Sequence, residues 1–166
     1  MDTAPIVTTV ALPNFGECTF AETEVITFPW GLPGFAELRR FLVLAIPEQA
    51  GYVWLQSLDD HAVALPLTDP WSLFDDYEAP LPHYAKQSLG LANPDDFCLL
   101  CVCVVGKGAA EMTINLLAPI VINLKTRVGR QVALENQRYS ARTPIPRKPA
   151  GSAAAGSAAA GEVVAT

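Results

Sequence analysis

Residues 113–123 constrain the fold of this chain more than any other segment. They read TINLLAPIVIN, an apolar run of strand-forming residues with an asparagine near each end and one internal proline. An unpaired buried amide costs about 1–3 kcal/mol, so we expect Asn115 and Asn123 to be buried and hydrogen-bonded to backbone. Pro119 cannot donate to a strand ladder and marks an edge, a strand start or a bulge. The run therefore predicts two short strands or one bent strand, and it carries no reactive group.

Short strand-like segments with glycine and proline between them recur along the chain. We expect strands at residues 19–28, 40–46, 52–57, 62–67, 97–105, 111–117, 121–125 and 131–135 and a short helix within 81–90. The stretch FPWGLPGF at 28–35 predicts a structured turn that depends on Gly31, Pro33 and Gly34. This spacing predicts an all-β fold: a small antiparallel β-barrel or sandwich with one or two short helices.

Three parts are expected along the chain. Residues 1–18, with two prolines, indicate a loose N-terminal lead-in, and residues 19–146 a single β domain. Residues 147–166 are rich first in proline and then in Gly, Ser and Ala, which is typical of a flexible tail or linker. A natural tail and an added linker both remain open.

Composition favours a cytoplasmic protein that does not enter a membrane. No uninterrupted apolar stretch is long enough to span a bilayer, and the first residues lack the pattern of a signal peptide. The four cysteines follow no disulfide spacing, which suits a reducing compartment.

Charge is distributed unevenly. Residues 1–124 carry 15 acidic and four basic side chains, whereas residues 125–148 carry seven basic side chains and one acidic. An acidic body disfavours direct nucleic-acid binding and favours encounter with a basic protein. The plain alternative is that this acidity only keeps the protein in solution.

The residue patterns that could carry chemistry all have simpler explanations, so we expect no catalytic residue, metal or cofactor. Cys101 and Cys103 share one face of an expected strand and Cys98 lies on the other, which favours buried thiols over a zinc site. Ser57, Asp59 and His61 are too close in sequence for a usual catalytic triad, and a hydrogen-bonded turn is the simpler interpretation.

Several motifs, in this order and spacing, resemble those of the FliW family of flagellar assembly factors. They are FPWGLPGF at 28–35, WLQSLDD at 54–60, DP at 69–70, DYE at 76–78, NLLAPIVIN at 115–123 and GRQV at 129–132. The resemblance covers about residues 20–146. It implies a compact β-barrel-like domain without enzymatic activity.

The same resemblance implies two protein partners, flagellin and CsrA, a small dimeric RNA-binding repressor of flagellin translation. The resemblance further implies that the free protein binds CsrA away from its RNA-contacting surface, which would make the inhibition allosteric. Accumulating flagellin occupies FliW and restores repression. No nucleic acid or membrane partner is implied.

The partner-binding residues are harder to assign. Our hypothesis is a partner-facing rim that mixes apolar and acidic groups at the end of a strand; its members are Leu55, Gln56, Ser57, Leu58, Asp59 and Asp60. The alternative is that the two leucines belong to the core and only the aspartates are exposed.

Two other functions remain open. One is a small β-barrel enzyme with an acidic pocket, which requires Asp69, Asp75 and Asp76 to approach His61 or His83. The other is a purely structural subunit, for which flagellin and CsrA would not compete.

Overall fold

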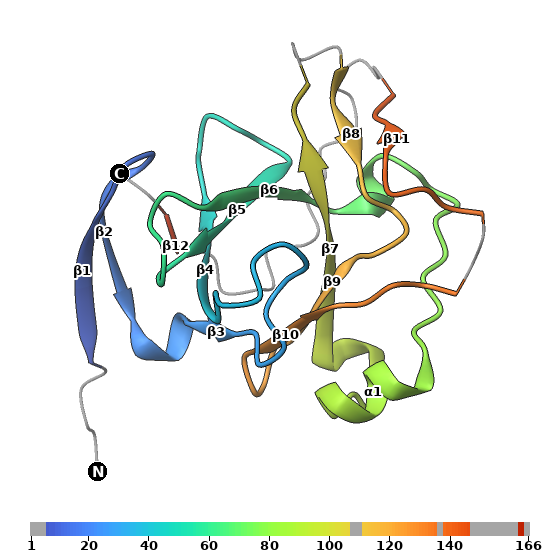
Figure 1. Cartoon of the computed structure of the whole chain (residues 1–166), viewed down its shortest axis with the longest axis horizontal. Helices are drawn as coiled ribbons and strands as arrows, with labels where there is room; N and C mark the ends of the chain where they lie inside the picture. The colour runs from blue at the N-terminus through green and yellow to red at the C-terminus, as the bar shows by residue number, and fades with distance from the viewer. Residues whose placement is uncertain (1–5, 107–110, 136–137, 147–162, 165–166) are drawn as a thin grey trace.

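The computed structural model describes residues 6–106, 111–135, 138–146 and 163–164 of the chain (Figure 1). The expected flexible tail at 147–166 therefore lies outside the described residues, apart from positions 163 and 164. The connection between the strands expected at 97–105 and 111–117 is described only at Gly106, because residues 107–110 lie outside the described residues.

Strands dominate the described residues, and one short α-helix accompanies them, which confirms the all-β prediction. The strands are β1 (Val7–Leu12), β2 (Gly16–Ala21), β3 (Ile26–Thr27), β4 (Arg40–Ala45), β5 (Tyr52–Ser57), β6 (Ala64–Thr68), β7 (Phe97–Val104), β8 (Thr113–Ile114), β9 (Ile120–Asn123), β10 (Val128–Gln131), β11 (Thr143–Pro144) and β12 (Val163–Val164). The helix is α1 (His83–Leu89), and the 3₁₀ turns are η1 (Glu22–Glu24), η2 (Pro70–Ser72) and η3 (Pro94–Asp96).

Seven of these strands close into a barrel. Neighbours pair in the order β7, β6, β5, β4, β3, β10, β9, and β9 pairs again with β7. The pairing of β3 with β10 is parallel, and the other pairings of the ring are antiparallel. Outside the ring, the C-terminal end of β7 pairs with β8, and β8 pairs with β11. Strand β12 pairs in parallel with the end of β4. Closure leaves few free sheet edges in the described part of the chain.

Alternating side chains of the ring strands fill the barrel interior. Phe28 and Phe41 are fully buried, with ring centroids 5.1 Å apart at a near-perpendicular angle. Leu55, Leu67 and Ile122 belong to the same buried cluster. An aromatic pair in this geometry adds to the stabilisation from apolar burial, so this cluster holds the barrel together.

The N-terminal lead-in predicted for residues 1–18 is wrong for its described part. β1 and β2 form an antiparallel hairpin in which Val7 pairs with Ala21 and Leu12 with Gly16. Leu12, Cys18 and Phe20 are buried against Leu42 and Leu44 of β4, on the outer side of the barrel. Pro13 lies in the turn between the strands, so it does not interrupt either ladder. The single strand predicted at 19–28 is likewise divided by η1 into the end of β2 and all of β3.

The strands expected at 121–125 and 131–135 imply a turn near residues 128–130, and that position of the turn is wrong. Val128–Gln131 is strand β10, and the turn occupies the preceding residues, with Arg127 at φ 57°. Gly129 is needed for packing, because a Cβ there would lie 2.7 Å from the ring of Phe28. A glycine that permits close approach of two segments resembles a turn glycine in the sequence.

The run that dominates the sequence becomes two short strands. Thr113–Ile114 forms β8 and Ile120–Asn123 forms β9, with Pro119 directly before β9. Every residue of β9 is buried, because β7 and β10 flank it in the ring.

Candidate functional site

The proposed rim at the end of β5 is wrong as a continuous surface. Leu55, Gln56 and Ser57 are fully buried, and Leu58 is half-buried against the β1–β2 hairpin. Both faces of β5 are covered, because Leu55 points into the barrel while Gln56 lies opposite Leu42 of the outer cluster. Of the six residues, only Asp59 and Asp60 are exposed.

The two aspartates belong to a tightly bonded turn between β5 and β6. Ser57 Oγ accepts hydrogen bonds from the backbone N–H groups of Asp59 (3.1 Å) and Asp60 (2.9 Å). Asp59 Oδ2 accepts from the N–H groups of Arg39 (2.6 Å) and Arg40 (3.0 Å), which fixes the start of β4. These bonds show that the segment is a hydrogen-bonded turn, as the sequence predicted.

Gln56 also supports this turn from inside the protein. Its Nε2 group lies 2.8 Å from the carbonyl oxygen of Ser57 and 3.1 Å from that of His61. Its Oε1 has no hydrogen-bond partner among the described residues. The side chain therefore serves the backbone of the β5–β6 turn and is not available to a partner.

The two asparagines are hydrogen-bonded to backbone, at different depths. Asn123 is buried; its Nδ2 donates to the Leu89 carbonyl at 2.6 Å, and its Oδ1 accepts from the N–H groups of Lys125 and Thr126. Asn115 is half-buried rather than buried, and its Oδ1 accepts from the N–H of Ala118 at 2.9 Å. Asn123 thus joins the end of α1 to the β9–β10 turn.

The turn between β3 and β4 depends on its glycines. Gly31 has φ 63°, and a Cβ there would lie 2.6 Å from the Ala36 carbonyl oxygen. Pro33 and Gly34 are the central residues of a turn closed by a 2.7 Å bond from the Phe35 N–H to the Leu32 carbonyl, with Gly34 at φ 84°. Proline followed by a residue with positive φ is the pattern of a type II turn.

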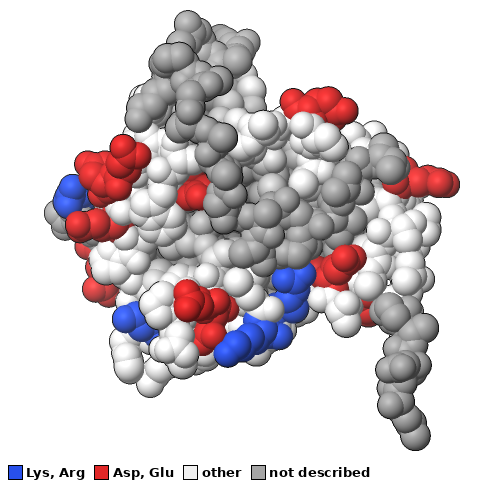
Figure 2. Space-filling model, turned by 180° about the vertical axis from the view of Figure 1, so that it is seen from behind, with Lys and Arg blue, Asp and Glu red and all other residues white. Residues whose placement is uncertain are grey.

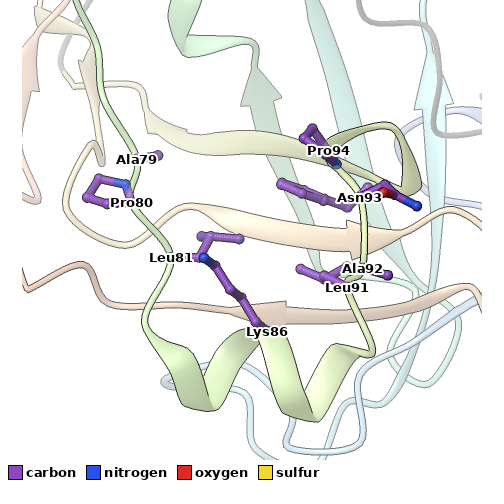
Figure 3. A pocket seen from close by; sticks show the side chains of 9 residues that line it. Ala79, Pro80, Leu81, Lys86, Leu91, Ala92, Asn93 and Pro94 are labelled. Atoms are coloured by element: carbon purple, nitrogen blue, oxygen red, sulfur yellow. The ribbon is translucent and has the colours of Figure 1, made fainter.

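A surface pocket of about 300 Å³ lies between α1, the segment before it and the start of β7 (Figure 3). Leu81, Leu91 and Phe97 contribute apolar surface, and Lys86 of α1 is its one titratable lining residue. Within the described ranges, no group of three or more His, Cys, Asp or Glu side chains is arranged to hold a metal ion.

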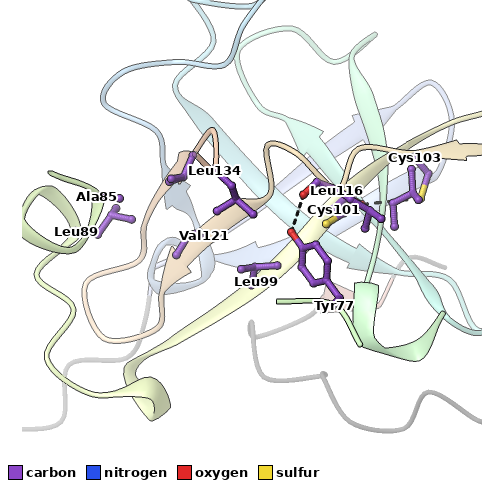
Figure 4. Close-up of a cluster of buried hydrophobic side chains, with 11 residues drawn as sticks. Tyr77, Ala85, Leu89, Leu99, Cys101, Cys103, Leu116, Val121 and Leu134 are labelled. Carbon is purple, nitrogen blue, oxygen red and sulfur yellow. Dashed lines mark hydrogen bonds between the residues drawn. The ribbon is translucent and has the colours of Figure 1, made fainter. Parts of the chain in front are cut away.

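The second buried cluster packs α1 and the β8–β9 region against the barrel (Figure 4). Tyr77 donates from its hydroxyl to the Leu116 carbonyl at 2.8 Å. Burial raises the pKa of the Cys101 and Cys103 thiols to about 12. Neutral thiols in an apolar cluster are inert, as the sequence predicted for these two residues.

Charge on the surface follows the imbalance seen in the sequence. Figure 2 shows acidic side chains spread over one face of the molecule and a short band of basic ones in its lower part. The described ion pairs are Arg40–Glu22, Lys125–Asp96 at 2.9 Å and Arg138–Glu78 at 3.8 Å. The hydrogen bond from Lys125 lowers the pKa of Asp96. In the described part of the chain, no helix has the length and apolar character needed to span a membrane.

One exposed cluster was not predicted from the sequence. Arg130 from β10 lies over the rings of Trp30, from the β3–β4 turn, and Tyr84, from α1. The sequence offers one weak signal for it, a tryptophan in a turn rich in proline and glycine.

Comparison with known proteins gives a consistent result. The family model described as FliW protein matches residues 9–145. The flagellar assembly factor FliW of Pseudothermotoga lettingae is 41% identical over 130 residues, covering 78% of this chain and 83% of that protein. That of Clostridium tetani is 34% identical over 132 residues, covering 80% and 91%.

The fold agrees with this match. A crystal structure of the flagellar assembly factor FliW superposes with a TM-score of 0.78 at 31% identity, covering 86% of this chain and 100% of that one. The chain therefore belongs to the FliW family of flagellar assembly factors.

Proposed function

We propose that this protein binds flagellin in the cytoplasm and antagonises the translational regulator CsrA by protein–protein binding. Free protein binds CsrA allosterically and relieves its repression of flagellin translation. Flagellin that accumulates in the cell occupies the protein and leaves CsrA free to repress. The match to the FliW family over residues 9–145 is the observation that carries this proposal.

The charge of the protein supports a basic partner. The chain has a formal net charge of −6, and its first 124 residues are far more acidic than the whole. An RNA-binding regulator presents basic surface, and opposite charges accelerate the encounter of two proteins. Asp59 and Asp60 are the two residues of the proposed rim that are exposed, and we assign this encounter to them.

The proposal is tested by recovery of partners from the native cytoplasm. The protein carries an affinity tag and is incubated with lysate in the presence and absence of added purified flagellin. We expect CsrA to be recovered without added flagellin and to be displaced when flagellin is added. Recovery of neither protein would contradict the proposal, and recovery of CsrA regardless of flagellin would favour two independent sites over a switch.

A further inference from the structure

The guanidinium group of Arg130 lies over two exposed aromatic rings. Its central carbon lies 4.4 Å from the ring centroid of Trp30 and 4.8 Å from that of Tyr84. Its Nη1 donates to Ser88 Oγ at 2.9 Å. We call Trp30, Tyr84 and Arg130 the arginine clamp. Among the described residues, Ser88 is the one hydrogen-bond acceptor of this guanidinium, which leaves its other N–H donors for a ligand.

The clamp is preorganised by the fold. Gly129 lets β10 approach Phe28 closely, which brings Arg130 beside the β3–β4 turn that carries Trp30. On α1, Ala85 and Leu89 are buried in the core, so Tyr84 and Ser88 are left to face Arg130. Three separate segments therefore fix the guanidinium before any ligand arrives, which reduces the entropy cost of binding.

The two aromatic rings of the clamp are substantially exposed to solvent. Trp30 is 47% exposed and Tyr84 is 44% exposed, although both are large aromatic residues. Tryptophan, tyrosine and arginine are the residues most enriched among the strongest contributors to protein–protein binding. A rigid cluster of all three on the surface has the composition of a protein-binding site.

Arg130 forms no ion pair with a described residue. The ion pairs of the described residues involve Arg40, Lys125 and Arg138, and none involves Arg130. A guanidinium has five N–H donors in a planar fork, and the pair of donors along one edge matches a carboxylate. The acidic body disfavours an extended polyanion, whereas a single carboxylate is attracted at short range.

We propose that the arginine clamp binds a protein segment in which an acidic side chain is flanked by apolar ones. The carboxylate pairs with the edge of Arg130, and the apolar neighbours pack on the exposed parts of Trp30 and Tyr84. This inference goes beyond the proposed flagellar partners and does not depend on them, because it concerns the chemistry that this surface recognises.

The test uses NMR of the indole N–H groups with two blocked peptides, acetyl-Leu-Glu-Leu-amide and acetyl-Leu-Gln-Leu-amide. The other two tryptophans serve as internal references, because Trp54 Nε1 donates to Gln49 Oε1 and Trp71 Nε1 donates to the Tyr77 carbonyl. We expect the Glu peptide to shift the Trp30 resonance saturably and the Gln peptide to bind about fivefold more weakly, while both references stay in place.

Variants separate the clamp from general effects of charge. Arg130→Gln should abolish the preference for the Glu peptide, whereas Arg130→Lys should retain part of it because the charge remains. Arg138→Gln is the matched control, since Arg138 is also an arginine beside an aromatic ring, 5.8 Å from the Tyr139 centroid, and it should behave as the wild type.

Three results would overturn the inference: no shift of Trp30, equal binding of the Glu and Gln peptides, or an equal shift with inorganic phosphate at the same concentration. The comparison of the two peptides needs only the wild-type protein, so it decides the matter even if a variant folds poorly. Flagellin and CsrA take no part in this experiment, so its failure would leave the proposed function standing.

Discussion

Replacing Asn123 tests how the barrel holds its helix. The side chain makes three hydrogen bonds, at 2.6 Å to the Leu89 carbonyl and at 2.9 and 3.1 Å from the N–H groups of Lys125 and Thr126. Each such bond contributes about 1 kcal/mol net, so we expect Asn123→Ala to lower the free energy of unfolding by about 3 kcal/mol. Asn115→Ala is the matched control; it removes one bond from a half-buried side chain and should cost about 1 kcal/mol.

Urea denaturation followed by circular dichroism and tryptophan fluorescence measures both costs. With a urea dependence of about 2 kcal/mol per molar, the midpoints should fall by about 1.5 M for Asn123→Ala and about 0.5 M for Asn115→Ala. Amide hydrogen exchange should also accelerate in α1 for the first variant, because the anchor at Leu89 is lost. An Asn123→Ala variant that loses no more stability than Asn115→Ala would refute the role we assign to this residue.

Three further predictions follow from packing and charge. Gly129→Ala should lower the free energy of unfolding by about 2 kcal/mol, because its Cβ would lie 2.7 Å from the Phe28 ring. A double-mutant cycle with Phe28→Leu should show favourable coupling, and strictly additive free energies would contradict the clash. Burial raises the pKa of the Cys101 and Cys103 thiols from near 9 to about 12, so these thiols ionise at lower pH in the unfolded chain than in the folded protein. Their contribution to the free energy of unfolding should therefore be fully present below about pH 9 and be lost between pH 9 and 12. By pH 10 the loss is about 1.4 kcal/mol per thiol, and urea denaturation of Cys101→Ala/Cys103→Ala should show a shallower pH dependence, whereas an unchanged dependence would count against this explanation. The double variant Asp59→Asn/Asp60→Asn keeps the oxygen acceptors of the turn and removes two charges. Its association rate with CsrA, measured by stopped flow at low salt, should fall more than that of the control Asp75→Asn/Asp76→Asn. Equal association rates for the two variants would remove the special role of this turn.

Local signals predicted part of the fold well. β5 matches its expected bounds, since an apolar segment there is bounded by Gly51 on one side and by a turn of aspartates on the other. α1 ends where Gly90 adopts φ 64°, as a glycine after a helix predicts. These features depend on a few neighbouring residues, and the sequence displays them directly.

The errors share a different cause, which is contact between distant segments. Gly129 has the appearance of a turn residue until Phe28 is placed against it. Gln56 and Ser57 have the appearance of surface residues until β4, β6 and the N-terminal hairpin cover β5. The arginine clamp joins three segments whose proximity exists only in the closed barrel. Pattern and propensity do not contain this information, because it arises from tertiary packing.

The most direct test of the proposed function measures CsrA bound to fluorescently labelled flagellin leader RNA by fluorescence anisotropy. We predict that this protein releases the RNA without binding it, that excess RNA does not overcome the release, and that added flagellin restores the CsrA–RNA complex. The second outcome distinguishes allosteric antagonism from competition for the RNA surface. An anisotropy that stays unchanged at saturating protein, or a release that flagellin does not reverse, would contradict the central claim.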